Sequence, residues 1–303
     1  MKPFRFSLVP RRMKDLIASK AMLALTVFAV LLVLLMIAGL YLKSRPVLAS
    51  HSLGELLFST RWRPFRGQFG FLPFIMGTLW VTGVAMLIAV PLCLLTAIYL
   101  SEYAPARVRE WIKPLIDILA GIPSVVFGVW GMLVVVPFIK DTVAPAVKVF
   151  STGYSVLAGG IVLAIMVFPV IIHVTLEVLR AVPNEVREAS LALGATRWQT
   201  VKRVVLRKAL PGVAAAVVLG IARAFGETMA VLMVVGNVPK VPKSVLDPAY
   251  PLPALIANNY GEMLSVPLYD SALMLAALIL LLVILAFNVA SRLVLRRVER
   301  SLR

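Results

Sequence analysis

Six long apolar segments constrain this chain more than any other feature of its sequence. Each is close to or above the roughly 20 residues that a helix needs to cross the hydrocarbon core of a bilayer. Hydrophobic residues make up 61% of the 303 residues, and the mean hydropathy is +0.95, whereas a soluble domain is about 45–50% apolar. The sequence therefore predicts an all-α integral membrane protein with six transmembrane helices. The expected segments are 21–42, 71–100, 115–139, 153–179, 212–236 and 271–294.

The segments predict a simple order of parts along the chain. The letters "VLAS" at 47–50 faintly resemble a signal-peptide cleavage site. The preceding apolar run has 22 residues, however, and the apolar core of a signal peptide has about 7–15. We therefore expect the first segment to be retained as a membrane helix. The predicted parts are a basic tail 1–20, a first transmembrane helix 21–42, an outer loop 43–70, a core 71–294 containing the loop 180–211, and a basic tail 295–303.

The positive charge of the chain predicts its orientation. The net charge is +17; in a soluble protein this would suggest nucleic-acid binding, but in a membrane protein basic loops stay on the cytoplasmic side. With the N-terminus inside, the cytoplasmic parts are the two tails and the loops 101–114 and 180–211. Counted together with Arg292, they carry 21 of the 31 Lys and Arg, and the outer loops carry nine. The pattern favours two cytoplasmic termini. The basic cluster at 61–66 in the first outer loop is the exception.

The loop 180–211 has the chemistry of ordered helices. Pro183, Glu185 and Glu188 suit the first turns of a helix, and Gly194 suits its end. A second short amphipathic helix is expected over 196–208. A basic amphipathic loop can lie on the membrane surface or serve as a docking element for a cytoplasmic partner, and the pattern alone leaves both open.

Part of this loop, "EASLALGATRWQTVKRVVL", resembles the EAA loop of ABC-importer permeases. Two positions depart from that pattern: Ser190 replaces the second Ala, and Arg207 stands where Pro is usual. The resemblance implies that the loop binds the ATPase subunits, and the departure at Arg207 leaves the geometry of the second helix open. The residues that match the pattern, and that the resemblance assigns to ATPase coupling, are Glu188, Ala189, Gly194, Val204 and Leu206.

Several other stretches, among them "AGIPSVVFGVWGMLVVVP", "ARAFGETMAVLMVVGN" and "LIANNYGE", are together similar to the C-type permease subunits of phosphate ABC importers (PstC-like) over about 69–292. The resemblance implies a type I ABC importer (MetI-like) bundle in a bacterial or archaeal plasma membrane. It also implies four partners besides membrane lipid: an A-type sister permease, two ATPase subunits and an extracytoplasmic phosphate-binding protein.

The sequence carries no familiar catalytic or metal-binding motif. It has no G-x-x-x-x-G-K-[ST] phosphate loop, no H-E-x-x-H and no cysteine cluster, since Cys93 is its single cysteine. We therefore expect a transporter subunit that is not itself an enzyme and that binds no cofactor, with ATP used by a partner subunit.

Arg223 and Glu227 stand out because they are charged residues in the apolar fifth segment, "GIARAFGETMAVLMV". A charged side chain at that depth costs at least about 2.5–3.5 kcal/mol and usually faces a bundle interior or a pathway. Four residues apart on one helix, the two would share a face. They are either a self-neutralising structural pair or part of a path for an anion, for which the forked guanidinium of arginine is suited.

Weaker candidates and rival functions remain open at this point. Asp117 and His173 lie near the ends of their segments and are expected to serve helix packing more than the path. The leading hypothesis is the permease subunit of an ATP-driven phosphate importer. The rivals are a permease for another anion such as molybdate or sulfate, an ion-coupled secondary transporter, and a membrane scaffold without transport.

Overall fold

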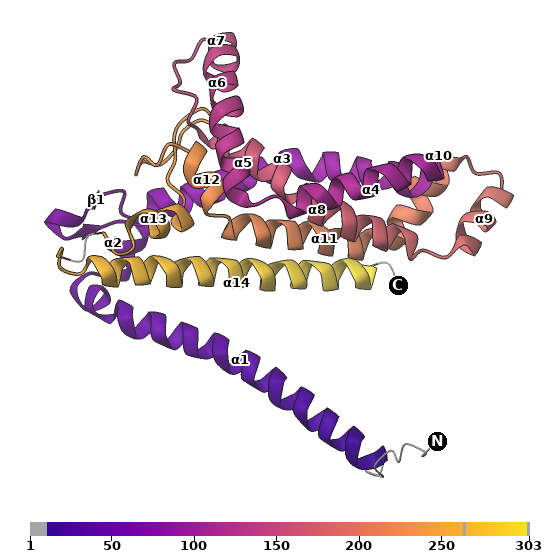
Figure 1. Ribbon diagram of the computed structural model, residues 1–303, viewed down its shortest axis with the longest axis horizontal. Coiled ribbons are helices and arrows are strands. Elements are labelled where there is room, and N and C mark those ends of the chain that lie inside the picture. The colour runs from indigo at the N-terminus through magenta and orange to yellow at the C-terminus, as the bar shows by residue number, and fades with distance from the viewer. Residues whose placement is uncertain (1–10, 263–264, 302–303) are drawn as a thin grey trace, which may run out of the picture.

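The computed structural model describes residues 11–262 and 265–301. The first ten residues of the predicted N-terminal tail and the last two residues of the C-terminal tail lie outside these ranges. Except for one two-stranded hairpin, the regular structure of the described residues is helical (Figure 1). The elements are α1 (Arg11–Ser50), α2 (Leu53–Phe58), β1 (Trp62–Arg63), β2 (Gln68–Phe69), α3 (Leu72–Ile98), α4 (Ala106–Gly121), α5 (Ser124–Trp130), α6 (Val136–Phe138), α7 (Ala144–Ala146), α8 (Val156–Arg180), α9 (Asn184–Ala192), α10 (Arg197–Thr200), α11 (Leu206–Gly226), α12 (Met229–Val234), α13 (Leu252–Asn259) and α14 (Tyr269–Ser301).

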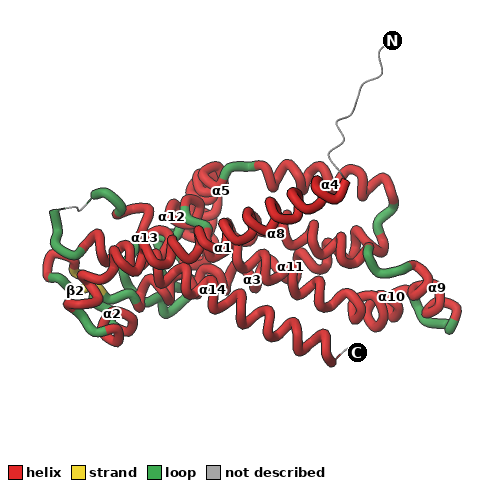
Figure 2. The backbone as a smooth tube through the Cα atoms, turned by 90° about the horizontal axis from the view of Figure 1, so that it is seen from below, coloured by secondary structure: helices red, strands yellow, loops and turns green. Residues whose placement is uncertain are grey.

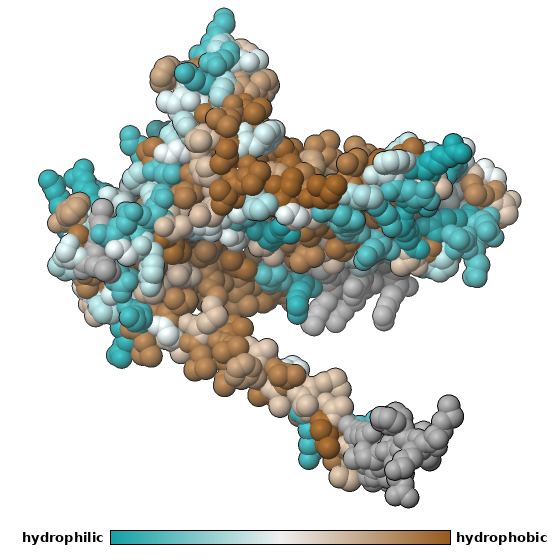
Figure 3. Space-filling model, viewed as in Figure 1, coloured by the Kyte–Doolittle hydropathy of each residue, from teal (hydrophilic) through white to brown (hydrophobic). Residues whose placement is uncertain are grey.

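Within the described ranges, six helical stretches are long and apolar enough to cross a membrane, which confirms the predicted fold class. Several of these helices continue through π-helical turns, for example Tyr99–Tyr103 after α3 and Val201–Val205 before α11. Apolar side chains cover the middle of the bundle and polar ones gather at its ends (Figure 3). The six stretches are Asp15–Ser50, Leu72–Tyr103, Ser124–Ala146, Val156–Arg180, Arg197–Gly226 and Tyr269–Leu293.

The third predicted segment, 115–139, is wrong as a single helix. The chain forms α4, breaks at Ile122 and Pro123, and then forms a new helical stretch from α5 to α7. Ile122 is extended, with φ −70° and ψ 128°, because the residue before a proline is pushed away from helical geometry. The prediction rested on the number of apolar residues alone, and it therefore merged the end of α4 with the membrane-spanning stretch that begins at α5.

The centre of the bundle is formed by α3, α8 and α11. α3 packs along α8, and α8 packs along α11. Gly212 and Gly220 of α11 lie against Val178 and Ile171 of α8, where an added Cβ would lie within 2.4 and 2.6 Å of the valine and isoleucine side chains. These two contacts show that α11 runs antiparallel to α8 and that its small residues allow the close approach.

The remaining elements define the two ends of the molecule. The start of α1 and the end of α14 lie at the end that carries α9 and α10, which we call the α9 end (Figure 1). The hairpin, α2 and α13 lie at the opposite end, the α13 end, and most loops gather at these two ends (Figure 2). α1 contacts α14 but leaves its membrane-spanning stretch otherwise exposed. The predicted helix 21–42 is therefore the middle of a longer helix.

Candidate functional site

The helix that carries Arg223 ends three residues beyond it. α11 stops at Gly226, Glu227 is extended with φ −71° and ψ 125°, and α12 begins at Met229. The prediction of one helix over 212–236 is therefore wrong. Glycine is a poor helix former, and the Glu227 carboxylate accepts a hydrogen bond from the Ala230 backbone N–H at 3.3 Å. This side chain caps the first turn of α12, and its competition with the backbone favours a break over a continuous helix.

The break separates the two charged residues that the sequence placed on one helix face. Among the described residues, a basic and an acidic side chain meet at Asp117–His173 and at Glu102–Arg187, so Arg223 and Glu227 do not form such a contact. The i, i+4 relationship requires both residues to be helical, and Glu227 is not. The self-neutralising pair, one of the two alternatives left open by the sequence, is not formed in this structure.

Arg223 nevertheless lies at the middle depth of the bundle. In the antiparallel register set by Gly212 with Val178 and Gly220 with Ile171, Arg223 is level with about Phe168, halfway along α8. Its side chain is exposed on the surface of the single chain. A charged group at this depth is too costly to leave in lipid, so this face requires a polar covering from a second protein or a water-filled path.

Glu227 faces a small polar niche that sequence reasoning missed. A cavity of about 10 Å³ lies between the α11–α12 break and α3, and its polar lining comes from Glu227, Thr78 and Thr82. Such a volume holds about one water molecule. The Thr78 hydroxyl accepts a hydrogen bond from the Leu252 N–H at 2.9 Å and so joins α3 to α13. In the sequence, the signal for this niche is the pair Thr78 and Thr82, which lie four residues apart in an otherwise apolar helix.

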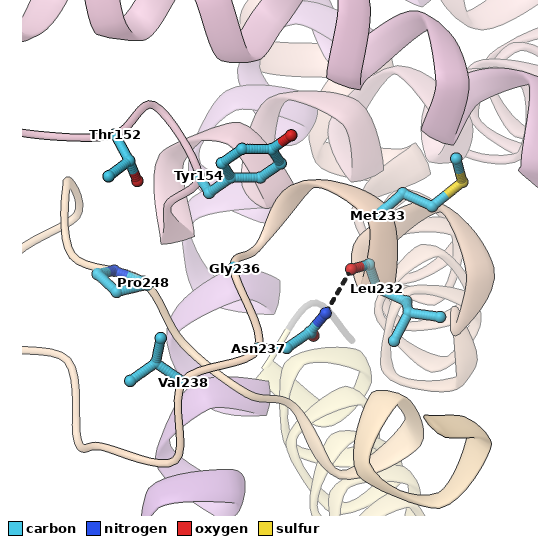
Figure 4. Close-up of a pocket in the computed structure, with 8 residues that line it drawn as sticks. All are labelled: Thr152, Tyr154, Leu232, Met233, Gly236, Asn237, Val238 and Pro248. Carbon is cyan, nitrogen blue, oxygen red and sulfur yellow. Dashed lines mark hydrogen bonds between the residues drawn. The ribbon is translucent and has the colours of Figure 1, made fainter. Parts of the chain in front are cut away.

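A larger pocket of about 490 Å³ lies beyond α12 but has the wrong chemistry for an anion (Figure 4). Asn237 projects from its wall and donates a hydrogen bond to the Leu232 carbonyl at 2.8 Å. Among the described residues, no lysine or arginine lines this pocket, and none of the predicted site residues does. The lining residues are Thr152, Tyr154, Leu232, Met233, Gly236, Asn237, Val238 and Pro248.

The predicted coupling loop forms an ordered projection at the α9 end. α9 ends in a Schellman motif: Gly194 has φ +82°, its N–H bonds to the Leu191 carbonyl, and the Ala195 N–H bonds to the Ser190 carbonyl. A capping box between Thr196 and Gln199 then starts α10. The first short helix is confirmed. The second is not separate, because the helical stretch Arg197–Gly226 runs directly into the membrane, through Arg207.

One departure from the EAA pattern has a structural role. The hydroxyl groups of Ser190 and Thr200 lie 2.9 Å apart and form a hydrogen bond between α9 and α10. Thr200 is buried, with a relative exposure of 4%, so this bond satisfies a polar group that alanine at position 190 could not reach.

The residues predicted to couple to the ATPase divide into an outer and an inner set. Glu188, Ala189 and Gly194 are exposed, whereas Val204 and Leu206 are half-buried. Neighbouring Val201 and Val205 are buried in an apolar cluster with the ends of α3 and α8. The projection is therefore anchored to the bundle on one side and free for a partner on the other, where further apolar side chains are exposed: Leu191, Leu193 and Trp198.

An ion pair that sequence reasoning missed joins this projection to α3. Arg187 of α9 donates to both carboxylate oxygens of Glu102, at 3.0 and 3.3 Å, and to the Leu179 carbonyl at 2.7 Å. Both side chains are largely buried, with relative exposures of 16% and 9%.

A second contact joins helices further along the bundle: His173 Nε2 lies 2.9 Å from Asp117 Oδ1 and links α8 to α4. This geometry supports the predicted packing role of His173 and Asp117.

Comparison with known proteins identifies the fold and the family. Among solved structures, an alginate ABC transporter in complex with a periplasmic protein matches with a TM-score of 0.64 and 15% identity, covering 95% of this chain and 98% of that chain. An inward-facing MetNI methionine ABC transporter matches with a TM-score of 0.57 and 21% identity, covering 73% of this chain and 93% of that chain. These likenesses confirm the predicted permease fold.

Sequence relatives agree over most of the chain. It is 41% identical over 245 residues to a probable ABC transporter permease protein, YqgH, of Bacillus subtilis, with 78% of each chain covered. It is 38% identical over 261 residues to the phosphate transport system permease protein PstC of Xylella fastidiosa, covering 82% of this chain and 80% of that protein. Residues 89–303 match the model of the binding-protein-dependent transport system inner membrane components. The chain therefore belongs to this family of ABC transporter membrane subunits.

Proposed function

We propose that this chain is the membrane-spanning permease subunit of an ATP-driven importer of inorganic phosphate. The observation that carries the proposal is the position of Arg223, a cation level with the middle of α8 and exposed on the single chain. The PstC phosphate permeases of Xylella fastidiosa and Mesorhizobium japonicum match 82% and 91% of the chain, which supports phosphate over other anions.

Arg223 contributes the anion-binding group of the path. Its guanidinium presents a planar fork that matches two phosphate oxygens and replaces part of their hydration. The exposed face around Arg223 requires a covering, and a sister permease packed there would enclose a path between the two chains. The sister is expected to be of the A type.

Glu227 contributes the counter-charge that keeps phosphate binding transient. In this structure it caps α12 instead of pairing with Arg223. Because it lies in a non-helical link, a modest backbone rotation could move its carboxylate without unfolding either helix. We propose that Glu227 competes with phosphate for Arg223 during transport.

The projection formed by α9 and α10 is the site where two ATPase subunits act on the permease pair. Its outer face combines exposed Glu188 with exposed apolar side chains, as a partner groove requires. Its ion pair with Glu102 provides a direct connection to α3. ATP is bound and hydrolysed by the partner, and an extracytoplasmic phosphate-binding protein delivers substrate to the α13 end.

The α9 end is the cytoplasmic end. The positive charge of the predicted cytoplasmic parts favours this orientation, and the start of α1 and the end of α14 lie at the same end as α9 (Figure 1). Both termini are then cytoplasmic in a bacterial or archaeal plasma membrane.

The proposal is tested by uptake of labelled phosphate into vesicles that contain the full importer. Arg223→Ala should abolish or severely reduce uptake while assembly with the ATPase persists. Arg107→Ala, which removes an exposed arginine at the start of α4, is the matched control and should retain uptake. Competition by excess sulfate or molybdate at the level of phosphate itself would contradict the assigned substrate.

A further inference from the structure

A cavity rich in arginine lies at the α9 end, well away from the path residues. It has a volume of about 570 Å³ and lies where the turn between α3 and α4 meets the end of α8 and the α9–α10 projection. Four arginines line it against a single carboxylate, that of Glu102, so the lining carries a formal excess of three positive charges. The arginines are Arg109, Arg180, Arg187 and Arg197.

The single carboxylate is already neutralised. Arg187 forms two hydrogen bonds to Glu102, and its other donors reach the Leu179 and Val182 carbonyls and the Asn184 side chain. The Ser101 hydroxyl also donates to Glu102 at 3.0 Å. The Glu102–Arg187 pair is net neutral, so among the described lining residues the other three arginines face no carboxylate of their own.

Those three arginines have side-chain N–H groups that donate no hydrogen bond to any group in the part of the chain described here. Arg109 bonds to carbonyls of the α3–α4 turn through Nε and Nη2 and leaves Nη1 free. Arg197 stacks on Tyr103 at 4.9 Å and donates through Nη2 to the Glu102 carbonyl, which leaves Nε and Nη1. The Arg180 side chain makes no hydrogen bond to any described residue. Like charges placed around one space repel each other unless an anion joins them.

The position of the cavity indicates what kind of anion fits. α3 and α8 both end beside it, so it lies at the level where membrane helices leave the hydrocarbon. Tyr99 and Tyr103 are exposed at the same level, as aromatic residues are at the interface of a bilayer. Phosphate groups of lipids occupy this level, and arginine forks bind phosphate oxygens in pairs.

We propose that this cavity binds a phosphate group. The group is supplied either by the headgroup of an anionic phospholipid or by free inorganic phosphate on the same side of the membrane. Because Arg187 and Arg197 belong to α9 and α10 while Arg109 and Arg180 belong to α4 and α8, a bound phosphate joins the projection to the bundle. Its presence restrains the α9–α10 projection. The proposal does not depend on which substrate the importer carries.

Binding by the purified full chain tests this site with two probes. In one arm, native mass spectrometry measures retention of phosphatidylglycerol against phosphatidylcholine. In the other, equilibrium dialysis measures labelled inorganic phosphate, in an Arg223→Ala background that removes the proposed path site. Arg180→Gln should weaken binding of one probe by about tenfold, since one charge-assisted fork is lost, and Arg180→Gln/Arg197→Gln should weaken it further. The responding probe identifies the source of the phosphate group.

The matched control is Lys202→Gln/Arg203→Gln, which removes two exposed positive charges at the same end but outside the cavity. It should leave binding unchanged. The single variant Arg180→Gln removes no described hydrogen bond, so its folding should be unaffected. Equal binding by wild type and Arg180→Gln for both probes, or an equal loss in the control, would overturn the proposal. So would loss of ATPase binding with both probes unaffected, which would assign the arginines to carboxylates of the partner protein.

Discussion

Arg187 and Glu102 are 85 residues apart in the sequence and form a bidentate, largely buried ion pair between α9 and the end of α3. The projection on which a partner would act is thereby connected to the helix that packs along α8 at the centre of the bundle. A displacement of α9 would be transmitted to α3 through this contact.

Removing one partner of this pair should weaken both stability and coupling. Arg187→Ala leaves the Glu102 carboxylate buried without its cation, which costs about 3–5 kcal/mol when an ion pair is fully buried. We expect a lower thermal unfolding temperature in detergent and less phosphate transported per ATP hydrolysed. Arg107→Ala, which removes an exposed arginine at the start of α4 and at the same end, should change neither. Wild-type coupling in Arg187→Ala would show that α3 receives its signal elsewhere.

Gly194 is the residue that the end of α9 depends on. Its φ of +82° is costly for a residue with a branched Cβ, so Gly194→Val should distort the projection while the protein still inserts in the membrane. Co-purification of the ATPase should fall. Gly54→Ala is a suitable control because Gly54 lies in a short helix with open space around it. Normal ATPase binding and stimulation in Gly194→Val would exclude this loop as the docking site.

The hydrogen bond between Ser190 and Thr200 should hold α9 and α10 together. Ser190→Ala restores the residue typical of the EAA pattern but leaves the buried Thr200 hydroxyl without its partner, at a cost of about 1–3 kcal/mol. Faster amide hydrogen exchange over 184–200 is the expected result. In Ser190→Ala/Thr200→Val, where both hydroxyls are absent, exchange should return toward the wild-type rate. Additive effects of the two changes would show that the bond contributes nothing.

The membrane orientation can be measured with reporter fusions. Fusions at Ser301 and within 180–211 should report a cytoplasmic location, and a fusion near Ser244 should report the opposite side. A cytoplasmic signal near Ser244 would contradict the arrangement of the six helices.

The sequence predicted the features that depend on local composition. Apolar runs of sufficient length identified six membrane helices, and the residues around Gly194 identified the end of α9. The breaks within helices were harder to predict, because they depend on competition between local conformations. At Glu227 a side chain that bonds to the Ala230 N–H outweighs the helical pattern, and at Pro123 a proline ends a run that hydropathy alone would continue.

Contacts between distant segments could not be read from one sequence. Glu102 and Arg187 each looked like an ordinary charged residue of a loop, and only the packing of α9 beside α3 brings them together. The arginine cavity has the same origin, since its four arginines come from α4, α8, α9 and α10. Arg223 lies level with the middle of α8, whereas the helical relation to Glu227 that the sequence predicted is absent.

The central claim is that Arg223 and Glu227 act on the anion and are not retained for structure. Glu227→Gln keeps a side-chain oxygen that can cap α12, so the break should persist and only the charge is lost. Phosphate should then be held longer by Arg223, and uptake should fall without loss of protein. Glu227→Ala should in addition lose the cap, at a cost of about 1 kcal/mol.

The most direct test is phosphate uptake by reconstituted importers, normalised to inserted protein, for Arg223→Ala, Glu227→Gln and the apolar double variant Arg223→Leu/Glu227→Leu. The account predicts that all three assemble and that all three lose most of their uptake, the double variant included. Full uptake by the apolar double variant would contradict it, because a structural pair can be replaced by apolar residues and a group that binds the transported anion cannot.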